Sequence, residues 1–372
     1  MPLAALVGGI GAHVEDFDDT HLDTVVHPGA AVVPAALAVG EYLGANYGAV
    51  VEASALGMEV TLRVAMALGK EHFDRGWHVT GTFGHLGAAL ACSRLLGLDP
   101  LQTRHALGLA CTEAAGLQAA FGTMTKSFHP GKAAYDGVEA AFLAQQGFTS
   151  ARRSIEGRRG LGPVASSMFQ EAVMTSELGH RWEVEDNAFK PYACGIVSHP
   201  VIDAGVQLRD EGFSPDEVVS VVVRTNPVVL DVMGVKEPQD GLQSKFSVYH
   251  CFAVGLLDGA GGVEQFSTPR VLSSDVVDLR RKVSVQLDAS VERDSCTAEV
   301  VLSSGETRIC HVEHATASKA RPMTDAQLVR KMQELMKPVL GVEQATLITS
   351  TLLGESHSLE VAALAELCRG GR

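Results

Sequence analysis

The stretch from Gly76 to Lys132 constrains the fold most strongly, because Ala-rich helical segments alternate in it with Gly-rich turns. Small residues let helices approach one another closely, so the stretch predicts a rigid bundle of tightly packed helices. The predicted turns carry basic side chains, which are His78, His85, Lys126, His129 and Lys132. The first two precede the first helix and the other three follow the second. This pattern is typical of an active site assembled from the ends of helices.

Two of these residues are the main catalytic candidates. His78 lies in GWHVTGTFG, which is predicted to be a turn, and Lys126 lies in a second predicted turn, GTMTKSFHPG. A lysine flanked by small and hydroxyl residues near a helix end can bind an anion, or exchange a proton if its pKa falls. The alternatives are a buried histidine bonded to the backbone and a lysine exposed to solvent. The residues alone leave both interpretations open.

Five segments spread over most of the chain carry a resemblance to a known family. They read GWHVTGTFG (76–84), LLGLD (95–99), AAGLQAAFGTMTKSFHPGKAA (114–134), SHPVIDA (198–204) and KFSVYHCFAVGLLDG (245–259). In these segments the chain resembles the 2-methylcitrate dehydratase family, also called MmgE/PrpD, which includes cis-aconitate decarboxylases and an iminodisuccinate epimerase. The resemblance implies an enzyme that acts on a small carboxylic acid without a cofactor.

An acidic segment near the start of the chain, DFDDTHLDTVVHPG (16–29), offers a second group of candidates. Carboxylates beside histidines could bind a metal ion, could orient the imidazoles, or could form a solvated loop. The resemblance implies that Asp16, Thr20 and His27 line the active site without a metal, and it leaves His21 as a weaker candidate. Members of the family carry helices before this segment, so we expect either a short variant or a truncated chain.

Two later segments add four candidate residues. His199 precedes Pro200, which is predicted to begin a helix, so the imidazole would lie at the positive end of the helix dipole and stay neutral. The resemblance implies an active-site role for His199, with helix capping as the alternative. Lys190 lies in a turn just upstream, in KPYACG, which departs from the pattern of both the methylcitrate dehydratases and the animal decarboxylase and leaves the substrate open. Lys245 and Tyr249 share a face of a predicted helix, where the ammonium would lower the pKa of the phenol, and the resemblance implies that this tyrosine reaches the site.

Several signals predict where helices lie and begin. Apolar residues recur at helical spacing over residues 48–70, and within that helix Glu59 and Arg63 are placed to pair with each other. Asp99 is predicted to cap a helix that begins at the following proline. Thr324 opens a capping box that starts another helix.

Four β-branched runs appear only in the second half of the chain, at 217–225, 282–287, 297–302 and 307–314, and SSGE predicts a hairpin between the last two. Helical segments alternate with these runs, so residues 188–323 predict an α+β lid domain. Residues 1–187 predict a helical domain, to which residues 324–372 return. The predicted fold is therefore mainly α, a discontinuous all-helical domain with an inserted smaller α+β domain.

Charge and composition exclude several classes of function. A formal net charge of −14 argues against binding of nucleic acid, so an anionic substrate would need a local concentration of His, Lys and helix N-termini. The seven cysteines are scattered and suggest neither a disulfide framework nor a zinc site. No run is apolar enough to cross a membrane and no signal peptide is evident, so we expect a cytoplasmic protein. The small-residue helices and the family resemblance predict a homodimer.

The predicted site brings together His27, His78, His199, Lys126, Tyr249 and Asp16, with Thr20, Lys190 and Lys245 as further substrate-binding residues. Such a set suits removal of a proton next to a carboxylate, coupled to loss of water or carbon dioxide. The sequence predicts a metal-independent carbon–oxygen lyase that dehydrates a small di- or tricarboxylic hydroxy acid, as 2-methylcitrate dehydratase does. The alternatives are a cis-aconitate-type decarboxylase, an iminodisuccinate-type epimerase, and a helical binding or assembly protein with a vestigial site.

Overall fold

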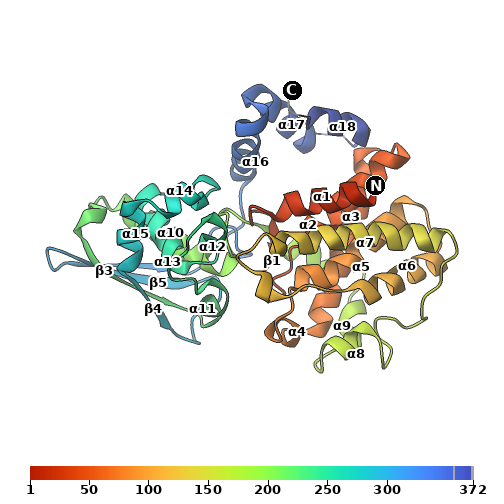
Figure 1. Cartoon of the computed structure of the whole chain (residues 1–372), viewed down its shortest axis with the longest axis horizontal. Coiled ribbons are helices and arrows are strands. Elements are labelled where there is room, and N and C mark those ends of the chain that lie inside the picture. Colours follow the sequence, from red (N-terminus) through yellow and green to blue (C-terminus); the bar gives the residue numbers. More distant parts are fainter. Residues whose placement is uncertain (355–356, 370–372) are drawn as a thin grey trace.

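The computed structural model of the chain describes residues 1–354 and 357–369. A helical domain and a smaller α+β domain lie side by side along the long axis of the molecule (Figure 1). This arrangement confirms the predicted fold class, mainly α with a smaller α+β part. Among the described residues, no helix combines the length and the apolar character needed to cross a membrane.

The helical domain is built around one buried helix. Helix α5 (Val79–Leu95) packs against its neighbours on several sides, and these are α2 (Pro28–Leu43), α3 (Tyr47–Leu68), α6 (Pro100–Glu113) and α7 (Thr125–Gln145). Helix α1 (Pro2–His13) covers α2 and α7. Short helices complete the domain, namely α4 (Glu71–Asp74), α8 (Leu161–Ala165) and α9 (Glu171–Thr175).

Glycine at the helix contacts explains why these helices approach so closely. A Cβ added to Gly87 of α5 would lie 2.5 Å from the Gly57 carbonyl of α3, and one added to Gly137 of α7 would lie 2.3 Å from Ala88 Cβ. Neither position leaves room for a side chain. The predicted close packing of small-residue helices is therefore confirmed.

The same contacts correct two predicted turns. The segment after His78 is the first part of α5 rather than a turn, because its glycines lie against other helices, and His85 is buried inside that helix. Lys126 likewise lies inside α7, as its second residue. Other predicted signals are confirmed: α3 covers nearly all of residues 48–70, Asp99 caps α6, and Thr324 caps α16 (Asp325–Leu340) with the predicted capping box.

The α+β domain contains a four-stranded sheet in the order β4-β3-β5-β6. The strands are β3 (Val218–Thr225), β4 (Val283–Leu287), β5 (Cys296–Leu302) and β6 (Thr307–Val312), where the β-branched runs predicted them. Strands β3 and β4 are parallel, and the other two pairs are antiparallel, including the predicted β5–β6 hairpin. Burial alternates along β3 and β5, so one face of the sheet is covered and the other faces solvent.

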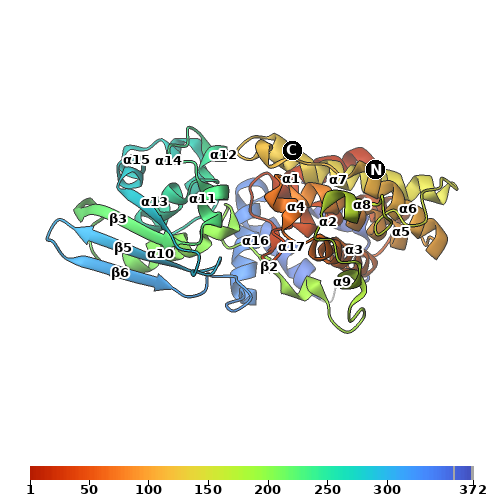
Figure 2. The same ribbon diagram turned by 90° about the horizontal axis from the view of Figure 1, so that it is seen from below.

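Helices cover that one face (Figure 2). The principal ones are α10 (His199–Asp210), α13 (Val248–Asp258) and α15 (Ser274–Arg281), with shorter pieces at α11 (Val228–Met233), α12 (Gly241–Ser244) and α14 (Thr268–Val271). Their apolar side chains and the buried residues of the sheet form the largest hydrophobic core of the protein within the described residues.

The chain crosses between the two domains at a small antiparallel ribbon. Strand β1 (Asp19–His21), just after α1, pairs with β2 (Asn187–Phe189), just before the α+β domain. After β6 the chain returns through α16, α17 (Val342–Leu353) and α18 (Val361–Leu367), which arch over the helical domain (Figure 1). Val361 of α18 packs into a core cluster with side chains of α2 and α3.

Candidate active site

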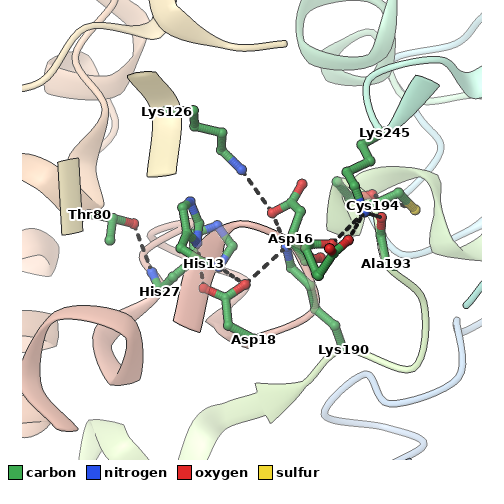
Figure 3. A network of polar contacts seen from close by, with 12 residues as sticks. His13, Asp16, Asp18, His27, Thr80, Lys126, Lys190, Ala193, Cys194 and Lys245 are labelled. Carbon is green, nitrogen blue, oxygen red and sulfur yellow. Dashed lines mark hydrogen bonds and ion pairs between the residues drawn. The ribbon is translucent and has the colours of Figure 1, made fainter. Parts of the chain in front are cut away.

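The centre of the candidate site is Asp16, which lies in the loop between α1 and β1. Lys126 donates to its Oδ1 atom at 2.8 Å, and Lys190 donates to the same oxygen at 2.7 Å (Figure 3). All three side chains are buried. Asp16 has a φ of 51°, a left-handed conformation that few residues other than glycine adopt. The backbone strain at Asp16 is offset by two ammonium groups that hold its carboxylate.

The two lysines differ in their readiness to lose a proton. Burial lowers the pKa of Lys126, and the nearby Asp16 carboxylate offsets only part of this effect. Burial also acts on Lys190, but the charges of Asp16 and Asp18 outweigh it and raise the pKa of Lys190. For Asp16 itself burial favours the neutral form, yet the ammonium charges of Lys126 and Lys190 hold its pKa well below the usual value. Lys126 is therefore the better proton donor of the pair.

A cluster of imidazoles lies beside this ion pair. The His13 ring is 4.9 Å from the His27 ring and 5.7 Å from the His78 ring, centroid to centroid. His13 Nδ1 lies 2.6 Å from Asp18 Oδ2, and His27 Nδ1 donates to the Asp19 carbonyl at 2.7 Å. His78 Nδ1 lies 2.8 Å from Nδ1 of His129, so these two nitrogens share one proton.

The imidazoles of this cluster are neutral at neutral pH. Burial lowers the pKa of His13 and, with the charges around it, lowers that of His78 well below the ordinary value. Burial lowers the pKa of His27 to about 3. Because its Nδ1 carries the proton that the Asp19 carbonyl accepts, Nε2 of His27 holds a lone pair.

Three of these residues lie at the N-termini of helices. His27 caps α2, His78 caps α5, and Lys126 is the second residue of α7. The backbone fixes them: His27 N–H donates to the hydroxyl of Thr80 at 3.0 Å, and His78 N–H donates to the Gly116 carbonyl at 3.1 Å. Converging helix N-termini favour a bound anion, because their dipoles point positive ends at the same place.

A cavity lies where the two domains meet at these residues. It encloses about 50 Å³. Charged and imidazole side chains line it from the helical domain and from the segment that joins the domains, and apolar side chains line it from both domains. The polar lining residues are Asp16, His27, His78, Lys126 and Lys190. Phe121 and Phe246 stack on each other at the cavity wall and place their rings within 5.5 Å of Lys126 Nζ.

The C-terminal segment also reaches the site. Lys331 of α16 donates to the Lys190 carbonyl at 2.7 Å, and its ammonium lies 4.4 Å from the centroid of the Phe17 ring. Burial lowers the pKa of Lys331 to about 8. Three distant stretches of chain therefore meet around Lys190.

Sequence comparison adds a family to this geometry. The model of the MmgE/PrpD N-terminal domain matches residues 1–172, and that of the MmgE/PrpD C-terminal domain matches residues 192–354. The chain belongs to the MmgE/PrpD family. The resemblance stated from the sequence segments is thereby confirmed.

Similar members of the family carry the name cis-aconitate decarboxylase. The mouse protein is 29% identical over 324 residues, covering 82% of this chain and 65% of the mouse chain, just under two thirds. The human protein is 27% identical over 398 residues, covering 98% of this chain and 82% of the human one. The Aspergillus terreus protein is 26% identical over 401 residues, covering 98% of this chain and 80% of its own.

Among the residues predicted from the sequence, Asp16, His27, His78, Lys126 and Lys190 line this cavity. Thr20 is fully buried in β1, and among the described residues its hydroxyl has no hydrogen-bond partner. Lys245 donates to the Glu15 carbonyl at 2.7 Å and to the Ala193 carbonyl at 3.2 Å, and it lines a smaller adjoining cavity with Asp16 and Lys126. Lys245 therefore holds together the loops on either side of the site.

Two predicted catalytic residues lie outside the cavity. His199 is the first residue of α10, its Nε2 is 3.4 Å from the Cys194 carbonyl, and it lines a separate pocket with His21. Tyr249 is partly buried against the core of the α+β domain. Tyr249 and Lys245 also do not share a helix, because Ser247 caps α13 between them and accepts from the His250 N–H at 3.2 Å.

Sequence reasoning did not choose three polar members of the site, although it weighed metal binding by the acidic segment to which one of them belongs. His13, Asp18 and His129 were not chosen, although His13 stands three residues before Asp16 and Asp18 lies in the DFDDT segment. Donor atoms of His13, Asp18 and His27 lie within 4.8 Å of one another, which is close enough to hold a divalent ion. However, the Lys190 ammonium is 3.6 Å from Asp18 Oδ1 and would repel such an ion. The residues present fit a bound anion better than a bound metal.

Proposed function

We propose that the protein is a cofactor-independent lyase that acts on a small di- or tricarboxylate in the cavity between its domains. The proposal rests on one observation. His27, His78 and Lys126 each lie at a helix N-terminus, and all three line a cavity that Lys190 also lines. Helix dipoles, ammonium groups and imidazoles together form a local anion site within an acidic protein.

The charge balance of the cavity fits a substrate that brings its own negative charge. Asp16 and Asp18 balance Lys126 and Lys190, while the buried imidazoles are neutral. An entering carboxylate raises the pKa of each imidazole that it contacts, because it favours the charged form. Substrate binding would therefore convert neutral histidines into proton donors that also neutralise the substrate.

Decarboxylation of the cis-aconitate type is the reaction that we propose first, because the similar relatives bear that name. In such a step the bond to one carboxylate carbon breaks, carbon dioxide leaves, and the electron pair spreads onto a remaining carboxylate. A proton donor then protonates carbon. We assign the donor to Lys126, whose pKa burial lowers, and the stabilisation of the developing charge to Lys190 and the helix N-termini.

Dehydration of a hydroxy acid such as 2-methylcitrate is the second candidate. It requires a base to remove a proton next to a carboxylate, and an acid to protonate the departing hydroxyl. His78 suits the base, since its Nε2 is buried without a hydrogen-bond partner among the described residues while its Nδ1 shares a proton with His129. Epimerisation of an amino-dicarboxylate would begin with the same proton removal.

Entry of the substrate requires the domains to separate. The cavity encloses about 50 Å³, which is room for only a few water molecules. We therefore propose that the α+β domain acts as a lid that opens for the substrate and closes on it.

The test is to incubate the purified protein separately with cis-aconitate, 2-methylcitrate, citrate and iminodisuccinate, and to follow each mixture by proton NMR and carbon dioxide release. We expect carbon dioxide and new vinylic proton signals from cis-aconitate, and no turnover by the Lys126→Met variant. Loss of water from 2-methylcitrate alone would select the second candidate. A folded protein that neither converts nor binds any of the four acids would overturn the proposal and favour a binding or assembly protein.

A further inference from the structure

A second cluster of titratable side chains lies inside the helical domain, away from the cavity. His85 projects from the middle of α5, Glu113 is the last residue of α6, and Asp136 lies in the middle of α7. None of the three lines the cavity between the domains. The proposed reaction therefore gives them no role.

The polar atoms at the centre of this cluster make no hydrogen bonds in the described part of the chain, although two of them, His85 Nδ1 and Asp136 Oδ2, lie within ion-pair distance of each other. His85 Nδ1, Glu113 Oε2 and Asp136 Oδ2 are each buried without a hydrogen bond within residues 1–354 and 357–369. His85 and Asp136 are buried almost completely, with 1% and 0% exposure. Buried polar atoms without hydrogen bonds are costly, and a cation bound between these three would compensate for that cost.

The spacing of these atoms fits one small ion. Donor atoms of the three residues lie within 4.8 Å of one another, and His85 Nδ1 is 3.0 Å from Asp136 Oδ2. Two ligands of a tetrahedral zinc ion, each about 2.0–2.1 Å from the metal, are separated by about 3.3 Å, so a small adjustment would place the metal between them. Lys132 contacts the other carboxylate oxygen of Asp136, Oδ1, so its ammonium does not occupy the position between Oδ2 and His85.

We propose that His85, Glu113 and Asp136 bind a divalent transition metal of the zinc class, with water in the fourth position. One imidazole nitrogen and two carboxylate oxygens are a ligand set that zinc accepts. An ammonium also lies beside this site, that of Lys132, but its side chain is 44% exposed whereas that of Lys190 is fully buried. Lys132 can therefore swing outward and open a path for the ion.

The metal would have a structural role, and it would also help to position residues of the active site. It would link α5, α6 and α7, the helices whose ends present His78 and Lys126. Glu113 stands three residues before Gly116, whose carbonyl accepts the His78 N–H. A metal on Glu113 would therefore fix the segment that holds His78.

The test is metal binding, independent of any enzymatic activity. The full-length protein is freed of metal with a chelator and titrated with Zn²⁺ by calorimetry and with Co²⁺ by visible absorption, in the presence of a reductant. The Glu113→Gln and His85→Asn variants remove ligands. His27→Gln removes a ligand of the other candidate set, and Glu139→Gln is a matched control that changes a carboxylate on the same helix as Asp136.

We expect one equivalent of Zn²⁺, a raised melting temperature, and a Co²⁺ spectrum without a thiolate band, all retained in His27→Gln and Glu139→Gln. Glu113→Gln and His85→Asn should bind at least tenfold more weakly, with far-ultraviolet circular dichroism confirming that they fold. If His85→Asn does not fold, Glu113→Gln alone decides the question. Wild-type affinity in Glu113→Gln, loss in His27→Gln instead, or no binding by the wild type would each overturn the site.

Discussion

Lys126 and Lys190 direct their ammonium groups at one oxygen atom, Oδ1 of Asp16, from 2.8 and 2.7 Å. One comes from the start of α7 and the other from the crossing between the domains. Both border the cavity, but they are not equivalent, because the side chain of Lys190 is fully buried and that of Lys126 is 10% exposed. This difference assigns proton transfer to Lys126 and the larger contribution to stability to Lys190.

Replacing each lysine by methionine should separate these roles. We expect Lys190→Met to lower the free energy of unfolding by about 3–5 kcal/mol, the usual cost of breaking a buried ion pair. Lys126→Met should cost less, because Asp16 keeps Lys190, but it should lower kcat/KM by at least about 100-fold. Urea unfolding and steady-state kinetics measure the two effects. Equal losses of stability in both variants would contradict this assignment.

Arg63 provides a control variant that should change the stability of the protein without changing its activity. It pairs with Glu59 at 2.5 Å, as predicted, and donates to the Ser176 carbonyl at 2.8 Å, away from the cavity. Arg63→Met should therefore lower the free energy of unfolding by about 3–5 kcal/mol. The folded fraction of Arg63→Met should keep the wild-type kcat/KM. A large loss of kcat/KM in this variant would show that reduced stability alone explains the loss of activity in the lysine variants.

His27 should make stability depend on pH. Burial lowers the pKa of its folded-state imidazole to about 3, whereas the unfolded chain has the ordinary value of about 6.5. Between these values the unfolded state binds a proton that the native state does not, so stability rises with pH across the window. In His27→Gln the slope of unfolding free energy against pH, measured with urea from pH 4 to 6, should fall by about 1.4 kcal/mol per pH unit. Parallel curves for variant and wild type would contradict the prediction.

His129 should act as a positioning residue for His78. Their Nδ1 atoms are 2.8 Å apart and share one proton, which fixes the tautomer of His78. His129→Leu should reduce kcat by about 10–100-fold and shift the pH–rate profile, while His129→Asn, which can still hydrogen bond, should recover part of the rate. Equal rates for the two variants would indicate that the hydrogen bond is unimportant.

His199 and Tyr249 test whether the cavity as described is the whole active site. Neither lines it, so His199→Asn and Tyr249→Phe should reduce kcat/KM by less than about tenfold, against at least about 100-fold for His78→Asn. The measurement is kcat/KM for all three variants with the same substrate. A large loss in Tyr249→Phe with unchanged stability would mean that the lid closes further and brings the phenol in.

Local signals in the sequence predicted much of the fold. The Asp99 and Thr324 caps and the β-branched strands depend on neighbouring residues, and each lies where it was predicted. The Gly-rich segment after His78 was misjudged because glycine also serves helix contacts, as Gly87 does against α3. The prediction that Lys245 and Tyr249 share one helix was wrong, because Ser247 caps a separate helix, α13, that begins after Lys245.

The site was harder to predict, since its contacts join residues far apart in the chain. Asp16 is separated by 110 residues from Lys126 and by 174 from Lys190, and no local pattern links them. The family resemblance supplied Asp16, whereas Lys126 and Lys190 were chosen as lysines in predicted turns. His13 lies outside the five segments that carry the resemblance, and His129 lies inside one of them without having been chosen; only the tertiary structure brings their rings against His78.

The contact between Lys331 and the Lys190 carbonyl ties the centre of the protein to a helix near the end of the described chain. During translation, the loop of Asp16 and the helices that hold His78 and Lys126 leave the ribosome long before α16 does. A nascent chain can thus build its helical core early, but it lacks the contact between Lys331 and Lys190 until α16 has been made.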